Sequence, residues 1–186
     1  DPSNALLPNW KHLPVAYHGR ASSIFVSGTN FHRPKGQVRP NDNEPPIFRP
    51  TKGLDIELEM ATVIGKANPI GDCIDVNQAE NYVFGFMLFN DWSARDIQKW
   101  EYVPLGPFLA KNFASSISPW IVTMDALEPF RCKGPNQEPM PLPYLQQKGK
   151  HAYDINLEVY IEPENVEPTL VSKSNFKYMY WSMSQQ

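Results

Sequence analysis

The segment at residues 54–60 alternates apolar and acidic side chains with a period of two. This alternation predicts a β-strand with one apolar face and one acidic face. On such a strand Glu57 and Glu59 project from the same face, about 6.7 Å apart. Residues 61–64 continue as an apolar run without alternation, so we expect this end of the strand to be buried. The segment therefore favours a fold built on sheets.

The two glutamates allow two interpretations. A buried carboxylate is costly unless it is paired or bound to a cation, so both groups can converge on one hard cation. Alternatively, the strand lies at a sheet edge and its acidic face is solvated. A cation held only by carboxylates is expected to be Ca²⁺ or Mg²⁺ rather than a transition metal. A zinc site is not expected, because the four histidines lack the required spacing: His12, His18, His32 and His151.

The remaining sequence predicts further strands joined by long loops. The chain has 186 residues with 19 prolines, about twice the average usage, and they concentrate at 39–50, 133–143 and 162–168. We predict strands at 23–26, 82–89, 117–124 and 152–161, a helical turn at 76–80, a helix at 92–101 and a C-terminal helix capped by Ser174. Strands and helices do not alternate regularly, which argues against a doubly wound sheet. We expect a β-rich α+β domain.

Composition and charge narrow the classes of function. A hydrophobic content of 41%, a charged content of 20% and a net charge of -3 indicate a globular domain without a basic surface. Neither nucleic acid nor a membrane is therefore expected as a partner, and no apolar run approaches the roughly 20 residues that span a bilayer. Cys73 and Cys132 form neither a metal-type spacing nor a disulfide pattern, so we expect a reducing compartment, the cytoplasm.

Two further stretches carry candidate functional residues. At residues 89–98 an apolar strand stops and a helix begins, so Asp91 is either a helix cap or a third oxygen ligand beside the two glutamates. Arg95 and Gln98 then either face solvent or point toward a ligand. At residues 104–113 a turn-rich apolar loop holds Lys111, which either extends to water or stabilises a developing oxyanion.

These stretches together resemble the fumarylacetoacetase (fumarylacetoacetate hydrolase) family. The matching segments are residues 4–10, 17–24, 54–60, 90–96, 98–108, 174–177 and 179–181, so the resemblance extends over essentially the whole chain. It implies that residues 1–186 are a central part of one catalytic domain, a mixed β-sandwich or β-roll that is incomplete at both ends and forms homodimers. It also implies metal-assisted hydrolysis of the carbon–carbon bond of fumarylacetoacetate, a β-diketone, to fumarate and acetoacetate in tyrosine and phenylalanine breakdown.

The resemblance assigns roles to particular residues. Carboxylate ligands of Ca²⁺ fall on Glu57, Glu59 and Asp91, and Mg²⁺ is associated with Asp91, Lys111 and Ser115. The family pattern has Thr at the last of these positions, and Ser keeps the hydroxyl. Substrate contacts fall on Tyr17, Gln98 and Tyr102, and oxyanion stabilisation falls on Arg95, Gln98 and Lys111.

The family's catalytic histidine and the glutamate that orients it match no position of this chain. We therefore expect the chain alone to be inactive, with activity belonging to a longer protein. Two alternatives stay open. One is another enzyme of the superfamily, an acylpyruvate hydrolase or oxaloacetate decarboxylase. The other is a non-catalytic metal-binding or dimerisation fragment.

Overall fold

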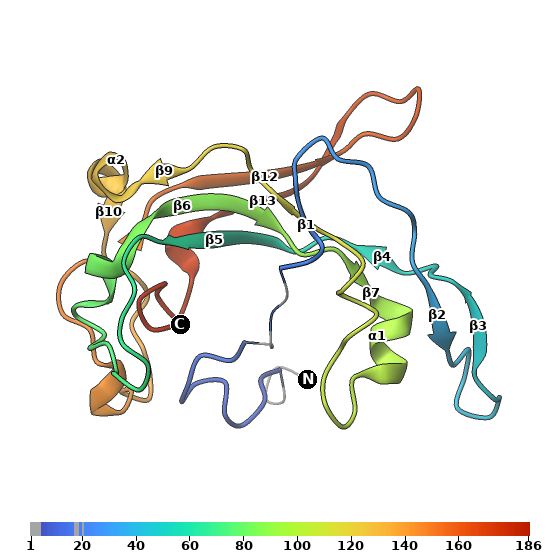
Figure 1. Ribbon diagram of the computed structural model, residues 1–186, viewed down its shortest axis with the longest axis horizontal. Coiled ribbons are helices and arrows are strands. Elements are labelled where there is room, and N and C mark those ends of the chain that lie inside the picture. Colours follow the sequence, from blue (N-terminus) through green and yellow to red (C-terminus); the bar gives the residue numbers. More distant parts are fainter. Residues whose placement is uncertain (1–4, 17–18, 20) are drawn as a thin grey trace. The chain divides into compact units, whose positions relative to one another are not determined.

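The computed structural model describes all residues except 1–4, 17–18 and 20 (Figure 1). The chain divides into two compact units. Unit 1 consists of Asp1–Ala16, Thr62–Gly85 and Val122–Gln186, and unit 2 consists of Tyr17–Ala61 and Phe86–Ile121. The boundary between the units falls within two strands, β5 (Leu58–Ile64) and β6 (Val83–Asn90).

The described part of unit 2 is built from short strands and the helix α1 (Figure 1). Its other elements are β1 (Ile24–Val26), β2 (Lys35–Val38), β3 (Ile47–Pro50), β4 (Leu54–Asp55), β7 (Ser93–Ala94), α1 (Arg95–Glu101) and β8 (Ser115–Ile117). Strand β8 pairs in parallel with β1 and antiparallel with β6, and β5 lies beside β6. Strands β2 and β3 form an antiparallel hairpin, and β4 pairs with β7. Parallel and antiparallel pairs thus occur in one sheet.

Unit 1 contains further short strands and isolated helical turns. Its other elements are η2 (Ala79–Tyr82), β9 (Val122–Thr123), α2 (Met124–Leu127), η3 (Glu128–Phe130), β10 (Arg131–Cys132), η4 (Pro143–Leu145), β11 (Ala152–Tyr153), β12 (Asn156–Ile161), β13 (Thr169–Asn175) and η5 (Phe176–Tyr178). Strand β9 pairs with β6, β10 pairs with β11, and β12 pairs with β13. The prediction of a strand-rich fold with few helices is confirmed.

The core of unit 2 forms where α1 packs on β2. Ile97 of the helix is 1% exposed and is clustered with Val38, Ala94 and Ala110. The helix approaches so closely because Gly36 has no side chain: a Cβ atom there would lie 2.9 Å from Cδ1 of Ile97. This packing fixes α1 relative to the hairpin that precedes the acidic segment in sequence.

The structure corrects the predictions near the acidic segment. The single strand predicted from residue 54 is interrupted at Ile56 and Glu57, where the backbone of Glu57 bonds to the last residue of β6 and to the residue after it. Its N–H donates to Oδ1 of Asn90 at 3.1 Å, and its carbonyl accepts from the N–H of Asp91 at 3.2 Å. The expected burial of residues 61–64 is wrong, since Ile64 is 64% exposed.

The helix predicted from residue 92 begins at Arg95. Residues 93 and 94 are in β7, and Ala94 precedes the helix without a side-chain cap, so Asp91 is not a helix cap. The strand predicted at 117–124 ends at Ile117, and a second strand begins at Val122. The strand predicted at 152–161 is divided into β11 and β12, and the C-terminal helix is replaced by the short η5, which Asn175 caps.

Within the described part of the chain, the structure has no helix of the length and apolarity needed to cross a lipid bilayer.

Candidate functional site

An acidic cluster in unit 2 consists of Glu57, Glu59 and Asp91. Glu57 lies in the interruption between β4 and β5, Glu59 lies in β5, and Asp91 directly follows β6. Two hydrogen bonds bring these segments together: the backbone N–H of Glu57 donates to the side chain of Asn90, and the carbonyl of Glu57 accepts from the N–H of Asp91. One carboxylate oxygen from each residue lies within 4.8 Å of the other two. The sequence placed the two glutamates side by side, and the fold adds the aspartate, 32 residues further along the chain.

Within the cluster, the pKa of Glu59 is raised. Although this residue is exposed overall, partial desolvation of its carboxyl group raises its pKa to about 7, and the hydrogen bond and negative charge of Glu57 add to the effect. Desolvation also acts to raise the pKa of Glu57, but hydrogen bonds from Lys111 and Arg95 outweigh it and the pKa is lowered. The carboxyl group of Glu59 therefore holds its proton more tightly than an ordinary glutamate does.

Lys111 is buried against this cluster. Its Nζ donates to Oε2 of Glu57 at 2.5 Å and to Oδ2 of Asp91 at 3.2 Å. The residue is only 5% exposed, so the interpretation in which its side chain extends to water is wrong. A buried ammonium needs anionic partners, and two carboxylates supply them here. The ammonium group is therefore held at the acidic cluster.

Arg95 holds the other side of Glu57. Its Nη1 donates to Oε1 of Glu57 at 2.7 Å and to Oε1 of Gln98 at 3.1 Å, while its Nε donates to Oδ2 of Asp55 at 2.8 Å. Glu57 therefore has one cation on each carboxylate oxygen. Gln98 directs its amide oxygen at Arg95, so its NH₂ group forms the donor end of the side chain. Both residues come from the first turn of α1.

Ser115 lies at the start of β8 and is fully buried. Its hydroxyl donates to Oδ1 of Asp91 at 2.8 Å. The two oxygens of Asp91 are thus bonded to different groups, Oδ1 to Ser115 and Oδ2 to Lys111.

The roles predicted for the two substrate tyrosines stay predictions. Tyr17 lies outside the described residues. Tyr102 directly follows α1 and is 53% exposed. Its role in substrate binding stays a prediction.

Several residues that position the site were missed from sequence. Asp55 pairs with Arg95, and the side chain of Asn90 holds the backbone of Glu57. Asp96 accepts hydrogen bonds from the hydroxyl of Thr51 and the backbone N–H of Lys52, and it forms an ion pair with Arg49. The sequence offered one signal for Asp55 and Asn90: both are polar and lie close to candidate ligands in the chain. Their partners could not be identified, because those lie more than 30 residues away in sequence.

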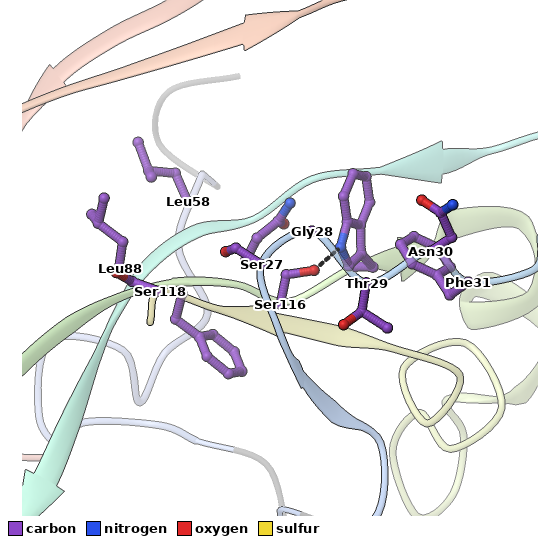
Figure 2. Close-up of a pocket in the computed structure, with 12 residues that line it drawn as sticks. Ser27, Gly28, Thr29, Asn30, Phe31, Leu58, Leu88, Ser116 and Ser118 are labelled. Atoms are coloured by element: carbon purple, nitrogen blue, oxygen red, sulfur yellow. Dashed lines mark hydrogen bonds between the residues drawn. The ribbon is translucent and has the colours of Figure 1, made fainter. Parts of the chain in front are cut away.

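A cavity of about 700 Å³ lies elsewhere in unit 2 (Figure 2). Leu58 contributes to its wall, whereas its neighbour Glu59 belongs to the cluster, and successive residues of a strand point to opposite faces. A hydrogen bond from Nε1 of Trp92 to Oγ of Ser116, 2.9 Å long, crosses its lining (Figure 2). None of the described residues that line it is acidic, basic, histidine or cysteine. The cluster, not this cavity, is therefore the candidate site for acid, base or metal chemistry.

The cluster fits a hard divalent cation. Its donors are carboxylate oxygens, which Ca²⁺ and Mg²⁺ prefer, and one oxygen from each of the three residues lies within 4.8 Å of the others. Lys111 already places one positive charge among these groups. The donor set indicates the class of cation and does not select between calcium and magnesium.

The raised pKa of Glu59 predicts a pH dependence of stability. Because the folded state binds this proton more tightly than the unfolded chain, the stabilisation is fully present below the ordinary pKa of 4.5 and is lost as the pH rises through about 7. In the full-length protein with chelator present, wild type should lose more stability between about pH 5 and pH 8 than Glu59→Gln, measured by urea unfolding. Glu44→Gln, an exposed control, should follow wild type. Parallel curves for wild type and Glu59→Gln would contradict the assignment.

Comparison with known proteins places this chain in a family. The model of the fumarylacetoacetate (FAA) hydrolase C-terminal family matches residues 4–186, and the chain belongs to this family. The chain is 59% identical to the fumarylacetoacetase of Oryza sativa subsp. japonica, over 100% of its own length and 43% of that protein. It is 56% identical to the fumarylacetoacetase of Homo sapiens, over 100% of its own length and 45% of that protein. The chain thus spans less than half the length of these relatives.

A likeness to a solved structure is weaker. The structure of Cg1458 overlaps with a TM-score of 0.49 and 18% identity, over 77% of this chain and 52% of that one. The family assignment rests on the sequence matches.

Proposed function

We propose that this chain forms the metal-binding and oxyanion-stabilising part of an enzyme that hydrolyses the carbon–carbon bond of fumarylacetoacetate to fumarate and acetoacetate. The observation that carries the proposal is the placement of a buried Lys111 ammonium and the Arg95 guanidinium on the two oxygens of Glu57, within a cluster of three carboxylates. The identity to fumarylacetoacetases over the whole chain supports the choice of substrate.

The proposed roles follow from the chemistry of the groups. Water attack on a carbonyl carbon places negative charge on its oxygen, and donors directed at that oxygen lower the barrier. Arg95, Gln98 and Lys111 carry N–H donors near one another and are proposed for this role. Tyr17, Gln98 and Tyr102 are proposed to contact the substrate. We assign the general base to none of the described residues.

Glu57, Glu59 and Asp91 are proposed to hold Ca²⁺, with Mg²⁺ near Asp91, Lys111 and Ser115. When bound, such a cation supplies Lewis-acid polarisation of an oxygen of the diketone. The protein residues orient the ligand oxygens: Ser115 and Lys111 fix Asp91, and Arg95 with Lys111 fixes Glu57.

Three further features belong to the proposal. We propose that the chain is part of one catalytic domain, that the enzyme is a homodimer as the family resemblance implies, and that it acts in the cytoplasm. The last is supported by two free cysteines, of which Cys73 is exposed, because exposed thiols persist in reducing compartments.

Turnover by the purified full-length protein tests the function. Fumarylacetoacetate should be consumed with loss of its ultraviolet absorbance, at a kcat/KM well above that for an acylpyruvate or for oxaloacetate. Chelation should lower the rate about 100-fold or more, since a Lewis acid contributes several kcal/mol to the barrier. Separate addition of Ca²⁺ and Mg²⁺ identifies the effective ion. A higher kcat/KM for either other substrate would overturn the substrate assignment, and metal binding without any turnover would overturn the enzyme assignment.

A further inference from the structure

Glu101, the last residue of α1, gathers three backbone N–H groups from a later loop. Its Oε1 accepts from the N–H groups of Phe108 at 2.9 Å and Ala110 at 2.7 Å. Its Oε2 accepts from the N–H of Leu109 at 3.2 Å. One carboxylate therefore binds three successive residues, which fixes both the position and the orientation of that backbone.

This placement is unfavourable for the helix and favourable for the loop. A carboxylate at the C-terminal end of a helix faces the negative end of the helix dipole. The three N–H groups, however, open a helical turn in which the N–H groups of Lys111 and Asn112 donate to the carbonyl of Phe108, at 3.1 Å and 2.8 Å. The first N–H groups of such a turn have no acceptor within it. Glu101 supplies that acceptor from another element.

The turn is also attached to the start of α1. The carbonyl of Ala110 accepts from the N–H of Ala94 at 2.9 Å, and both residues are fully buried. The backbone at residues 108–110 is thus held at one end of the helix by Glu101 and at the other by Ala94. The next residue is Lys111, whose ammonium reaches Glu57 and Asp91.

We propose that Glu101 is a positioning residue that acts through Lys111: its carboxylate fixes the turn at residues 108–112 and so places the Lys111 ammonium at the acidic cluster. The catalytic consequence rests on the proposed function. Displacement of a catalytic group by about 1 Å can cost on the order of 100-fold in rate, so loss of part of this clamp affects turnover more than substrate binding.

Glu101→Gln in the full-length protein tests the clamp with little change in size. The substitution replaces a carboxylate oxygen by an NH₂ group, which opposes a backbone donor instead of accepting from it. We expect kcat to fall about tenfold or more, with KM within about twofold of wild type. Glu44→Gln, the same chemical change at an exposed residue between β2 and β3, should leave both constants unchanged.

A double-mutant cycle separates positioning from a general structural effect. If Glu101 acts through Lys111, Glu101→Gln should lower kcat less than about twofold further in a Lys111→Met background. A second tenfold loss in that background, or an unchanged kcat for Glu101→Gln in the wild-type background, would overturn the proposal.

Amine labelling provides a readout that needs no turnover. Lys111 is 5% exposed and should react slowly with acetic anhydride, measured by mass spectrometry of its peptide against that of the exposed Lys99. Glu101→Gln should raise the relative labelling of Lys111 at least about fivefold, and Glu44→Gln should not; equal labelling in all three proteins would overturn the proposal. If the wild-type protein failed to consume fumarylacetoacetate, only the proposed function would be refuted. The labelling experiment would then still test whether Glu101 places Lys111.

Discussion

Replacing Lys111 with methionine should lower kcat about 100- to 1,000-fold in the full-length protein, with KM within about threefold of wild type. Methionine has a similar length and no charge. The ammonium of Lys111 lies 2.5 Å from Oε2 of Glu57 and is shielded from water, so it acts where charge interactions are strong. A donor to a developing oxyanion acts mainly in the transition state, and its loss is therefore expected in kcat.

The control for this prediction is Lys99→Met, on the exposed side of α1. It removes the same charge away from the cluster and should change kcat less than about twofold. Thermal unfolding of both variants separates lost chemistry from lost folding. If Lys111→Met changed KM as much as kcat in a folded protein, the ammonium would serve ground-state binding, and its oxyanion role would be wrong.

The pair of substitutions Glu57→Gln and Glu59→Gln should abolish Ca²⁺-dependent stabilisation of the full-length protein. At a free ion concentration one hundred times Kd, a single site stabilises the folded state by about 2.7 kcal/mol. Replacing two of the three clustered carboxylates removes two anionic ligands, so this stabilisation and the calorimetric heat of binding should both disappear.

Glu162→Gln with Glu164→Gln is the matched control. These two glutamates have the same spacing, the same change of charge and exposed side chains in the loop between β12 and β13. The control should keep the wild-type response to Ca²⁺. If the Glu57 and Glu59 variant instead kept the wild-type isotherm, the acidic cluster would not be the calcium site.

The sequence pattern predicted correctly those features that depend on neighbouring residues alone. Alternation at residues 54–60 predicted extended chain, and Glu59 does lie in a strand. The absence of regular strand and helix alternation argued against a doubly wound sheet, and the family resemblance implied the mixed sheet that the structure has. The resemblance selected residues that the fold brings together, namely the acidic cluster with Arg95, Gln98, Lys111 and Ser115.

The ends of the helices and strands, and the bonding partners of the site residues, depended on contacts with residues distant in sequence. Residues 93 and 94 have neighbours that favour a helix, yet they pair with residues 54 and 55, because β4 supplies backbone partners. Aspartate is common at helix N-caps, but the carboxylate of Asp91 instead accepts hydrogen bonds from Lys111 and Ser115. Helix propensity is a weak preference that such tertiary bonds override.

The sequence by itself determined which residue types are present, and its alternation predicted the strand that holds Glu59, since side-chain direction in a strand follows the local backbone. Only the tertiary structure decided that Lys111 is buried as an ion-paired group and that Glu101 clamps the turn before it. The reason is physical: burial and the pKa of Glu59 depend on groups that the fold brings within a few ångströms, and their separation along the chain does not reveal that distance.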